Sequence, residues 1–162
     1  MDKPDSATET FAAVVLHSQS AKWQGVPLQL TTGKALQTKR TSITVDFGEP
    51  DTNQLQFHIQ PEQGITLTLQ VKQPGLANQV TQTTMDFDYA TAFNIAQLDA
   101  YDRVLIDAMR GDQTLFASDE EVMASWRVLQ PVLDAWQAAG NIDLVPYEPG
   151  SDGPDVSKLI AG

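Results

Sequence analysis

Apolar residues recur at every second position through the first half of the chain, the spacing of strands that bury one face. Short turn-forming segments such as 48–51 and 61–64 separate these runs, and such links favour antiparallel neighbours. The alternation predicts six strands, near residues 11–15, 26–32, 43–47, 54–60, 65–72 and 80–87. A largely antiparallel β-sheet is therefore expected over about residues 10–87.

The spacing becomes helical after residue 90. An i, i+3, i+4, i+7, i+8 stripe occupies residues 101–109 and is followed by Gly111, which suits a left-handed cap. Ser118 and Glu121 have the spacing of a capping box, and an apolar face then continues to about residue 139. Pro131 lies within this second helix and is expected to bend it. No structure is assigned to residues 88–99.

Strands first and helices second predict an α+β fold, with helices packed on one face of the antiparallel sheet. The other face carries Thr, Gln and His instead of dense charge. Such a face can meet water or pair with a second copy of itself, and we expect a homodimer. The domain occupies residues 10–162, with helices over about 100–139 and an extended tail over 140–162. Residues 1–9 form a polar N-terminal tail.

Charge excludes several partners. The chain of 162 residues has a formal net charge of −11, and residues 82–162 hold four basic and fourteen acidic residues. Such a surface repels nucleic acid and anionic membranes, and no apolar run approaches the roughly 18–20 residues of a membrane span. The chain has no cysteine, which excludes disulfides and fits a reducing compartment. Because residues 1–9 are also unlike a secretory signal, a cytoplasmic location is expected.

A basic segment interrupts this acidic background. Three of the ten Lys and Arg residues fall within residues 33–40, namely Lys34, Lys39 and Arg40. Like charges so close together repel one another unless an anion lies among them, and Gly33 lets the backbone turn or approach a ligand closely. One interpretation is a binding site for a small anion such as phosphate. The alternative is a hairpin turn with solvated lysines.

Common catalytic motifs are missing. The sequence contains no G-x-G-x-x-G, P-loop, H-E-x-x-H or G-x-S-x-G pattern. His17 and His58 fall in separate strands without a second ligand at metal-binding spacing, so both are interpreted as structural. Asp86 and Asp88 share a strand face, where a like-charge pair with one raised pKa competes with a solvated strand end. We assign no catalytic, cofactor-binding or metal-binding residue.

Longer strings are more specific. They include W-x-G-V-P followed by TGKAL, then IQPEQGI, MDFDYA, and the series GDQTLF, SDE and ASWR. With them the chain closely resembles the C-terminal half of the glucose-6-phosphate dehydrogenase family over roughly residues 6–155. The resemblance implies the family's large β+α domain, whose antiparallel sheet also builds the dimer interface.

The resemblance also implies a role for the basic segment. The family's TGK lysine and a basic residue five positions on contact the sugar phosphate, and these positions are Lys34 and Lys39 here. Gln60, in the IQP motif, matches a glutamine that some members use towards the sugar. Lysine and a phosphate dianion make charge-assisted hydrogen bonds, which are shorter and stronger than neutral ones.

Parts of the family pattern have no counterpart. The N-terminal Rossmann domain, the RIDHYLGKE segment and the downstream general-base histidine are absent from this sequence. NADP or NAD is therefore expected for the full-length enzyme, and none bound by this chain alone. A structural NADP is not expected either, because only Arg40 keeps a charge at the positions concerned. The other positions hold Thr31, His58, Thr66 and Thr68.

Two functions follow. In the first, the chain is the substrate-binding and dimerisation part of an NADP-dependent enzyme that oxidises glucose 6-phosphate to 6-phosphogluconolactone, the entry step of the pentose phosphate pathway. It would be inactive alone, bind glucose 6-phosphate weakly and need a Rossmann half. In the second, it is a non-catalytic self-association module derived from that family.

Overall fold

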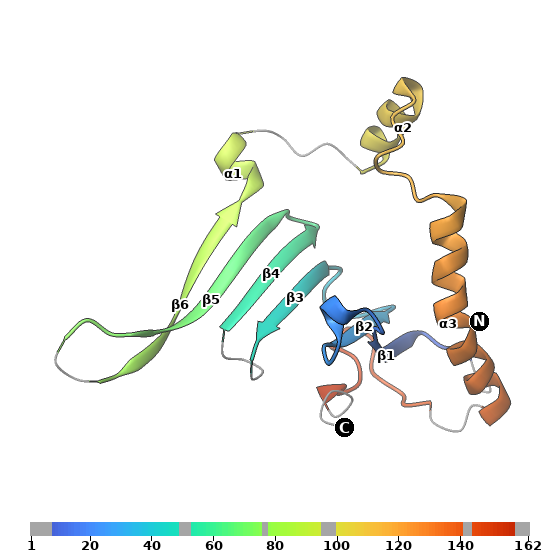
Figure 1. Ribbon diagram of the computed structural model, residues 1–162, viewed down its shortest axis with the longest axis horizontal. Helices are drawn as coiled ribbons and strands as arrows, with labels where there is room; N and C mark the ends of the chain where they lie inside the picture. The colour runs from blue at the N-terminus through green and yellow to red at the C-terminus, as the bar shows by residue number, and fades with distance from the viewer. Residues whose placement is uncertain (1–7, 49–52, 76–77, 95–99, 141–143, 158–162) are drawn as a thin grey trace. The chain divides into compact units, whose positions relative to one another are not determined.

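The computed structural model describes residues 8–48, 53–75, 78–94, 100–140 and 144–157 (Figure 1). Six strands and three α-helices occur in these ranges, and most of them lie where the apolar spacing predicts them. The strands are β1 (Phe11–His17), β2 (Pro27–Gly33), β3 (Thr41–Phe47), β4 (Asn53–Gln60), β5 (Gly64–Lys72) and β6 (Val80–Asp88). The helices are α1 (Tyr89–Phe93), α2 (Ala100–Arg110) and α3 (Asp119–Ala139), with a 3-10 turn at Ala21–Trp23. Most of the predicted tail over residues 1–9 lies outside the described ranges.

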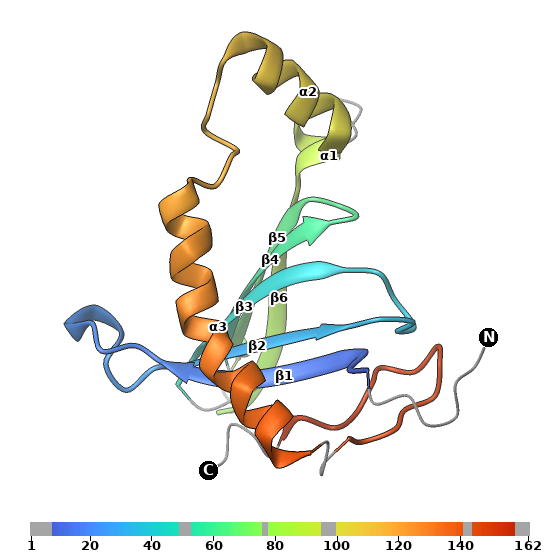
Figure 2. The same cartoon turned by 90° about the vertical axis from the view of Figure 1, so that its right-hand side faces the viewer.

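The chain divides into two compact units. The first combines Met1–Thr38 with Phe116–Gly162, and the second is Lys39–Leu115. In the first unit, β1 and β2 form a two-stranded antiparallel sheet in which Phe11 pairs with Gly33 and His17 with Pro27. Figure 2 shows these two strands side by side, with the C-terminal segment running back beside them.

Helix α3 belongs to the first unit and begins as the sequence predicts. The Ser118 hydroxyl accepts a hydrogen bond from the Glu121 N–H, and the Glu121 carboxylate accepts one from the Ser118 N–H at 2.8 Å. This arrangement confirms the capping box. Pro131 lies inside the helix, which ends at Gly140 in a left-handed conformation with φ 69°.

The second unit is built on a four-stranded antiparallel sheet in the order β3-β4-β5-β6. Its register aligns Thr44, Gln56, Thr66 and Asp86 in one row across the sheet. Because side chains alternate between faces, the neighbouring row, formed by Val45, Leu55, Leu67 and Met85, belongs to the opposite, apolar face. The sheet is thus amphipathic, as the period of two predicts.

The predicted α+β class and antiparallel pairing are confirmed, and two details differ. The strands are divided between two sheets instead of forming one. Within the second unit, α1 packs on β6, whereas α2 makes at most marginal contact with the sheet. On the apolar face of this sheet, Ile43 and Met85 are each 56% exposed. No described residue of the chain is fully buried.

Helix α1 occupies part of the segment that the sequence left unassigned. It continues directly from β6, and Asp88 caps it by accepting a hydrogen bond from the Thr91 N–H at 2.6 Å. The Phe93 ring lies beside Tyr89 and Phe87, with ring centroids 6.0 and 6.3 Å apart. No described helix combines the length and the apolar character that crossing a membrane requires.

Candidate functional site

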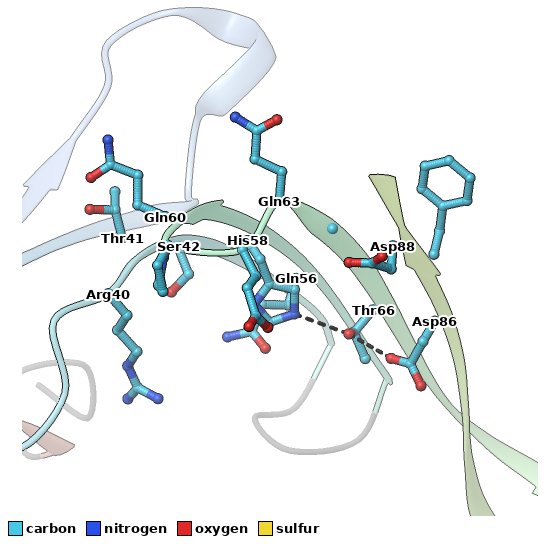
Figure 3. Close-up of a pocket in the computed structure, with 14 residues that line it drawn as sticks. Arg40, Thr41, Ser42, Gln56, His58, Gln60, Gln63, Thr66, Asp86 and Asp88 are labelled. Atoms are coloured by element: carbon cyan, nitrogen blue, oxygen red, sulfur yellow. Dashed lines mark hydrogen bonds between the residues drawn. The ribbon is translucent and has the colours of Figure 1, made fainter. Parts of the chain in front are cut away.

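A cavity of about 350 Å³ opens on the polar side of the second unit, where β3 and β4 meet β5 and β6 (Figure 3). Gln60, the last residue of β4, lines it and precedes Pro61 through a cis peptide bond. In the strand register, Gly64 pairs with His58 on one side and with Asp88 on the other. The row formed by these three residues therefore has no side chain at its centre. The other lining residues are Arg40, Thr41, Ser42, Gln56, Glu62, Gln63, Thr66, Asp86 and Phe87.

A chain of hydrogen bonds crosses the cavity from β4 to β6. The Thr66 hydroxyl donates to Asp86 Oδ1 at 2.7 Å, and His58 Nε2 lies 3.0 Å from the Thr66 oxygen (Figure 3). Since the one hydroxyl proton of Thr66 goes to Asp86, its oxygen accepts from His58, which places a proton on Nε2. The His58 ring is therefore tied to the neighbouring strand through Nε2.

The two aspartates of this strand have separate partners. Asp86 accepts from Thr66, and Asp88 accepts from Thr91. Hydrogen bonds from the Thr91 side chain and then from its backbone hold the pKa of Asp88 below its usual value. The hypothesis of a pair with a raised pKa is therefore wrong for Asp88, because stabilising the ionised form lowers the pKa. In the described ranges, no group of three or more Asp, Glu, His or Cys side chains is arranged to hold a metal ion.

Charge is unevenly placed around the cavity. Arg40 and Asp88 lie at opposite sides of it in Figure 3, and Glu62 and Asp86 add further negative charge to the lining. An anionic group is favoured only at the Arg40 side, whereas the carboxylates can accept hydrogen bonds from hydroxyl groups. The amide of Gln60 both donates and accepts. The lining is thus suited to a polyhydroxylated molecule whose negative charge is confined to one end.

Lys34 lies in the first unit, directly after β2. Its N–H donates to the Thr10 carbonyl oxygen at 2.8 Å, and its own carbonyl accepts from the Tyr147 hydroxyl at 2.7 Å. Gly33 is required by packing, because a Cβ at this position would lie 2.8 Å from Phe11 Cδ2 and 2.9 Å from a Leu36 methyl group. The main chain around Lys34 is thus held on both sides, while its side chain is exposed.

The cavity of the second unit includes some of the residues singled out in the sequence. Gln60 and Arg40 line the same cavity, and Lys39 is the first residue of the second unit and is not among the residues that line it. Convergence of Lys34 and Lys39 on one anion stays a prediction. Residues 33–40 are not a hairpin turn, because β2 pairs with β1 and β3 with β4. The other part of that alternative, solvated lysines, agrees with the exposed side chains of Lys34 and Lys39.

Two sets of contacts at the candidate residues were not predicted from the sequence. The chain from His58 through Thr66 to Asp86 requires the strand register, although the alternation places all three residues on the polar face. Tyr147 lies 113 residues after Lys34, and its one visible signal is that it is the sole aromatic residue in the Gly- and Pro-rich segment 144–157.

Comparison with known proteins places this geometry in context. A family model described as glucose-6-phosphate dehydrogenase, C-terminal domain, matches residues 1–161. Glucose-6-phosphate 1-dehydrogenase of Dictyostelium discoideum is 37% identical over 161 residues, covering 93% of this chain and 32% of the relative. Glucose-6-phosphate 1-dehydrogenase 2 of Mycobacterium bovis is 38% identical over 94% of this chain and 32% of its own length. The chain thus spans about a third of the length of these curated relatives.

Solved structures from the same family are similar to this chain. One, described as glucose-6-phosphate dehydrogenase in complex with its substrate glucose-6-phosphate, matches with a TM-score of 0.82 and 31% identity, over 99% of this chain and 35% of that one. A crystal structure of glucose-6-phosphate 1-dehydrogenase from Mycobacterium avium matches with a TM-score of 0.73 and 31% identity, over 93% of this chain and 33% of that one.

Proposed function

Because this chain belongs to the family of glucose-6-phosphate dehydrogenase C-terminal domains, as the sequence strings indicate, we propose that it supplies the substrate-binding and dimerisation part of an NADP-dependent glucose-6-phosphate 1-dehydrogenase. The observation that carries this proposal is the match over 99% of the chain to a structure described as holding glucose 6-phosphate. That enzyme would oxidise glucose 6-phosphate to 6-phosphogluconolactone.

Substrate binding is assigned to Lys34, Lys39 and Gln60. The two ammonium groups would bind the phosphate dianion through charge-assisted hydrogen bonds. The Gln60 amide, which both donates and accepts, would contact sugar hydroxyl groups. The polar lining of the Gln60 cavity supports this assignment, because its other side chains are also suited to hydroxyl groups.

Hydride transfer from the sugar would use residues outside this chain. The reaction needs a nicotinamide held against C1 and a base that takes the hydroxyl proton. We assign neither to the chain, so we expect it to be inactive alone and to work with a Rossmann half. We do not expect a second, structural dinucleotide either. Glu62, Asp86 and Asp88 in the Gln60 cavity would repel its phosphates, and Arg40 is the one Lys or Arg among the described residues of the lining.

The polar face of the four-stranded sheet is the proposed homodimer surface. Beside the cavity it presents Thr44, Thr68 and Thr84, which can hydrogen-bond across an interface without the desolvation cost of buried charge. The absence of cysteine from the sequence supports a cytoplasmic, reducing location.

Mixing is the direct test of this function. The purified chain is assayed for NADP reduction with glucose 6-phosphate, alone and with the N-terminal two-thirds of one of its relatives. We expect no turnover by the chain alone and activity in the mixture. The Lys34→Ala variant should reduce that activity strongly, whereas Lys22→Ala, which removes a lysine from the same unit, should not. An inactive mixture in which the chain still self-associates would contradict the proposal and favour the non-catalytic module.

Affinity gives an independent measurement. Two lysines and one amide without their N-terminal partners should bind glucose 6-phosphate with a dissociation constant of about 1 mM or more. A value of about 1 mM corresponds to a binding free energy of about −4 kcal/mol. Isothermal titration calorimetry of the lone chain measures this value. Unphosphorylated glucose is the control, and equal binding of both sugars would argue against a phosphate site.

A further inference from the structure

The C-terminal segment folds back onto the loop that carries Lys34. We call residues 147–153 the C-terminal strap. The Tyr147 hydroxyl donates to the Lys34 carbonyl oxygen at 2.7 Å and also lies 3.0 Å from the Thr10 carbonyl oxygen. Thr10 in turn accepts from the Lys34 N–H at 2.8 Å. Three segments that are distant in the sequence therefore meet at the main chain of Lys34.

Two more main-chain hydrogen bonds attach the strap to the same loop. The Gly150 N–H donates to the Ala35 carbonyl at 2.7 Å, and the Gln37 N–H donates to the Ser151 carbonyl at 2.8 Å. Ala35 has φ 51°, in the left-handed region that is unfavourable for a residue with a Cβ. A conformation of this kind persists when surrounding contacts over-determine it, and the strap supplies such contacts.

Side-chain packing closes the arrangement. The Tyr147 ring meets the Phe11 ring edge-on, with centroids 5.8 Å apart. Gly153 approaches the same ring so closely that a Cβ there would lie 2.7 Å from Phe11 Cε2. The strap is thus seated on β1 by apolar contacts, and its hydroxyl group is delivered to Lys34 from a half-buried position.

We propose that Tyr147 is a positioning residue for Lys34, an inference that rests on the proposed role of Lys34 in binding phosphate. Fixing both the N–H and the C=O of a residue fixes the direction of its Cα–Cβ bond. The ammonium group of lysine sits at the end of a flexible four-carbon chain. The direction of the Cα–Cβ bond therefore decides which volume the ammonium group can reach. Tyr147 acts on the phosphate through this geometry and without touching the phosphate itself.

The substitution Tyr147→Phe tests the proposal, because it removes the hydroxyl and keeps the ring against Phe11. Its matched control is Tyr89→Phe, at a ring that contacts Phe87 and Phe93 in the other unit. NMR spectroscopy of the full 162-residue chain gives two readouts. The first is hydrogen exchange of the Lys34 and Gln37 amides without ligand, and the second is the Lys34 side-chain shift during titration with glucose 6-phosphate.

In Tyr147→Phe we expect faster exchange at both amides and about 3- to 10-fold weaker binding reported by Lys34, with the β1–β2 amides unchanged. The control should alter neither readout. A double-mutant cycle separates positioning from general destabilisation. Its affinities are measured by isothermal titration calorimetry, because Lys34→Ala removes the reporter side chain, and in this background Tyr147→Phe should cause no further loss of affinity. A further loss there, or unchanged Lys34 exchange in the single variant, would overturn the proposal.

The two hypotheses fail differently. If titration with glucose 6-phosphate shifts the NMR signals of none of Lys34, Lys39 and Gln60 in the wild-type chain, the proposed function is contradicted for this chain. The exchange of the Lys34 amide then still decides whether Tyr147 fixes the loop. If the wild-type chain binds and Tyr147→Phe binds equally well with unaltered exchange, the positioning role is wrong and the proposed function stands.

Discussion

Gly153 and Gly150 offer a matched test of how the C-terminal strap is held. Both residues are left-handed, with φ of 86° and 83°. A Cβ at Gly153 would lie 2.7 and 3.0 Å from two Phe11 ring carbons, whereas a Cβ at Gly150 would meet nothing within 4 Å. The substitutions Gly153→Ala and Gly150→Ala therefore share a conformational cost and differ in packing.

The magnitudes follow from these two terms. Placing alanine in the left-handed region costs about 1–2 kcal/mol. Overpacking adds about 1–3 kcal/mol at Gly153, where the Phe11 ring must move to admit the methyl group. We therefore expect Gly150→Ala to destabilise the strap by about 1–2 kcal/mol and Gly153→Ala by about 2–5 kcal/mol.

Native-state hydrogen exchange of the Gln37 amide is the assay, because this N–H donates to Ser151 within the strap. Since 1.4 kcal/mol corresponds to a factor of about ten, Gly150→Ala should accelerate exchange roughly 5- to 30-fold. Gly153→Ala should accelerate it by at least about another factor of five. Equal acceleration in both variants would refute the packing argument, and no acceleration in either would refute the strap as a structural contact.

Three further outcomes are expected. Ser118→Ala removes the N-cap of α3 and should cost about 1 kcal/mol, measured as lost ellipticity at 222 nm on heating. The pKa of Glu121 lies below its usual 4.5 because the Ser118 backbone N–H and then its hydroxyl bind the carboxylate, so the cap contributes fully above pH 4.5 and is lost as the pH falls through the lowered pKa. A Glu121 carboxyl 13C titration midpoint at or above 4.5 would contradict this. Thr66→Val removes the hydroxyl that links His58 to Asp86, so the 15N shifts of the His58 ring should change. Unchanged shifts would show that the hydrogen-bond chain does not set the tautomer of His58.

Local patterns predicted much of the fold. Burial of one face imposes a period of two, so the strands from Thr41 to Asp88 were accessible from the sequence, as was the capping box at Ser118. Alternation does not say which strands pair. The division into two sheets depends on the connection over residues 34–40, which looked like a hairpin turn and instead separates two compact units.

The candidate site was less accessible, because its contacts join distant parts of the chain. Gln60 was found through a motif, and its place in a polar cavity follows from the alternation. The link between His58 and Asp86 needs the register of three strands, which no local spacing encodes. Tyr147 lies in a segment read as an extended tail, and nothing in its neighbourhood indicates that its hydroxyl reaches Lys34.

The bond between Tyr147 and Lys34 also imposes an order on biosynthesis. The two residues are 113 positions apart, so at about 5–20 residues per second a ribosome adds Tyr147 roughly 6–23 s after Lys34. During that interval the nascent Lys34 loop lacks the Tyr147 hydroxyl as a hydrogen-bond donor, whatever has already folded around it. Closure of this loop consequently waits until the strap has been synthesised, and a polypeptide that stops before Tyr147 has a basic loop without its strap contacts.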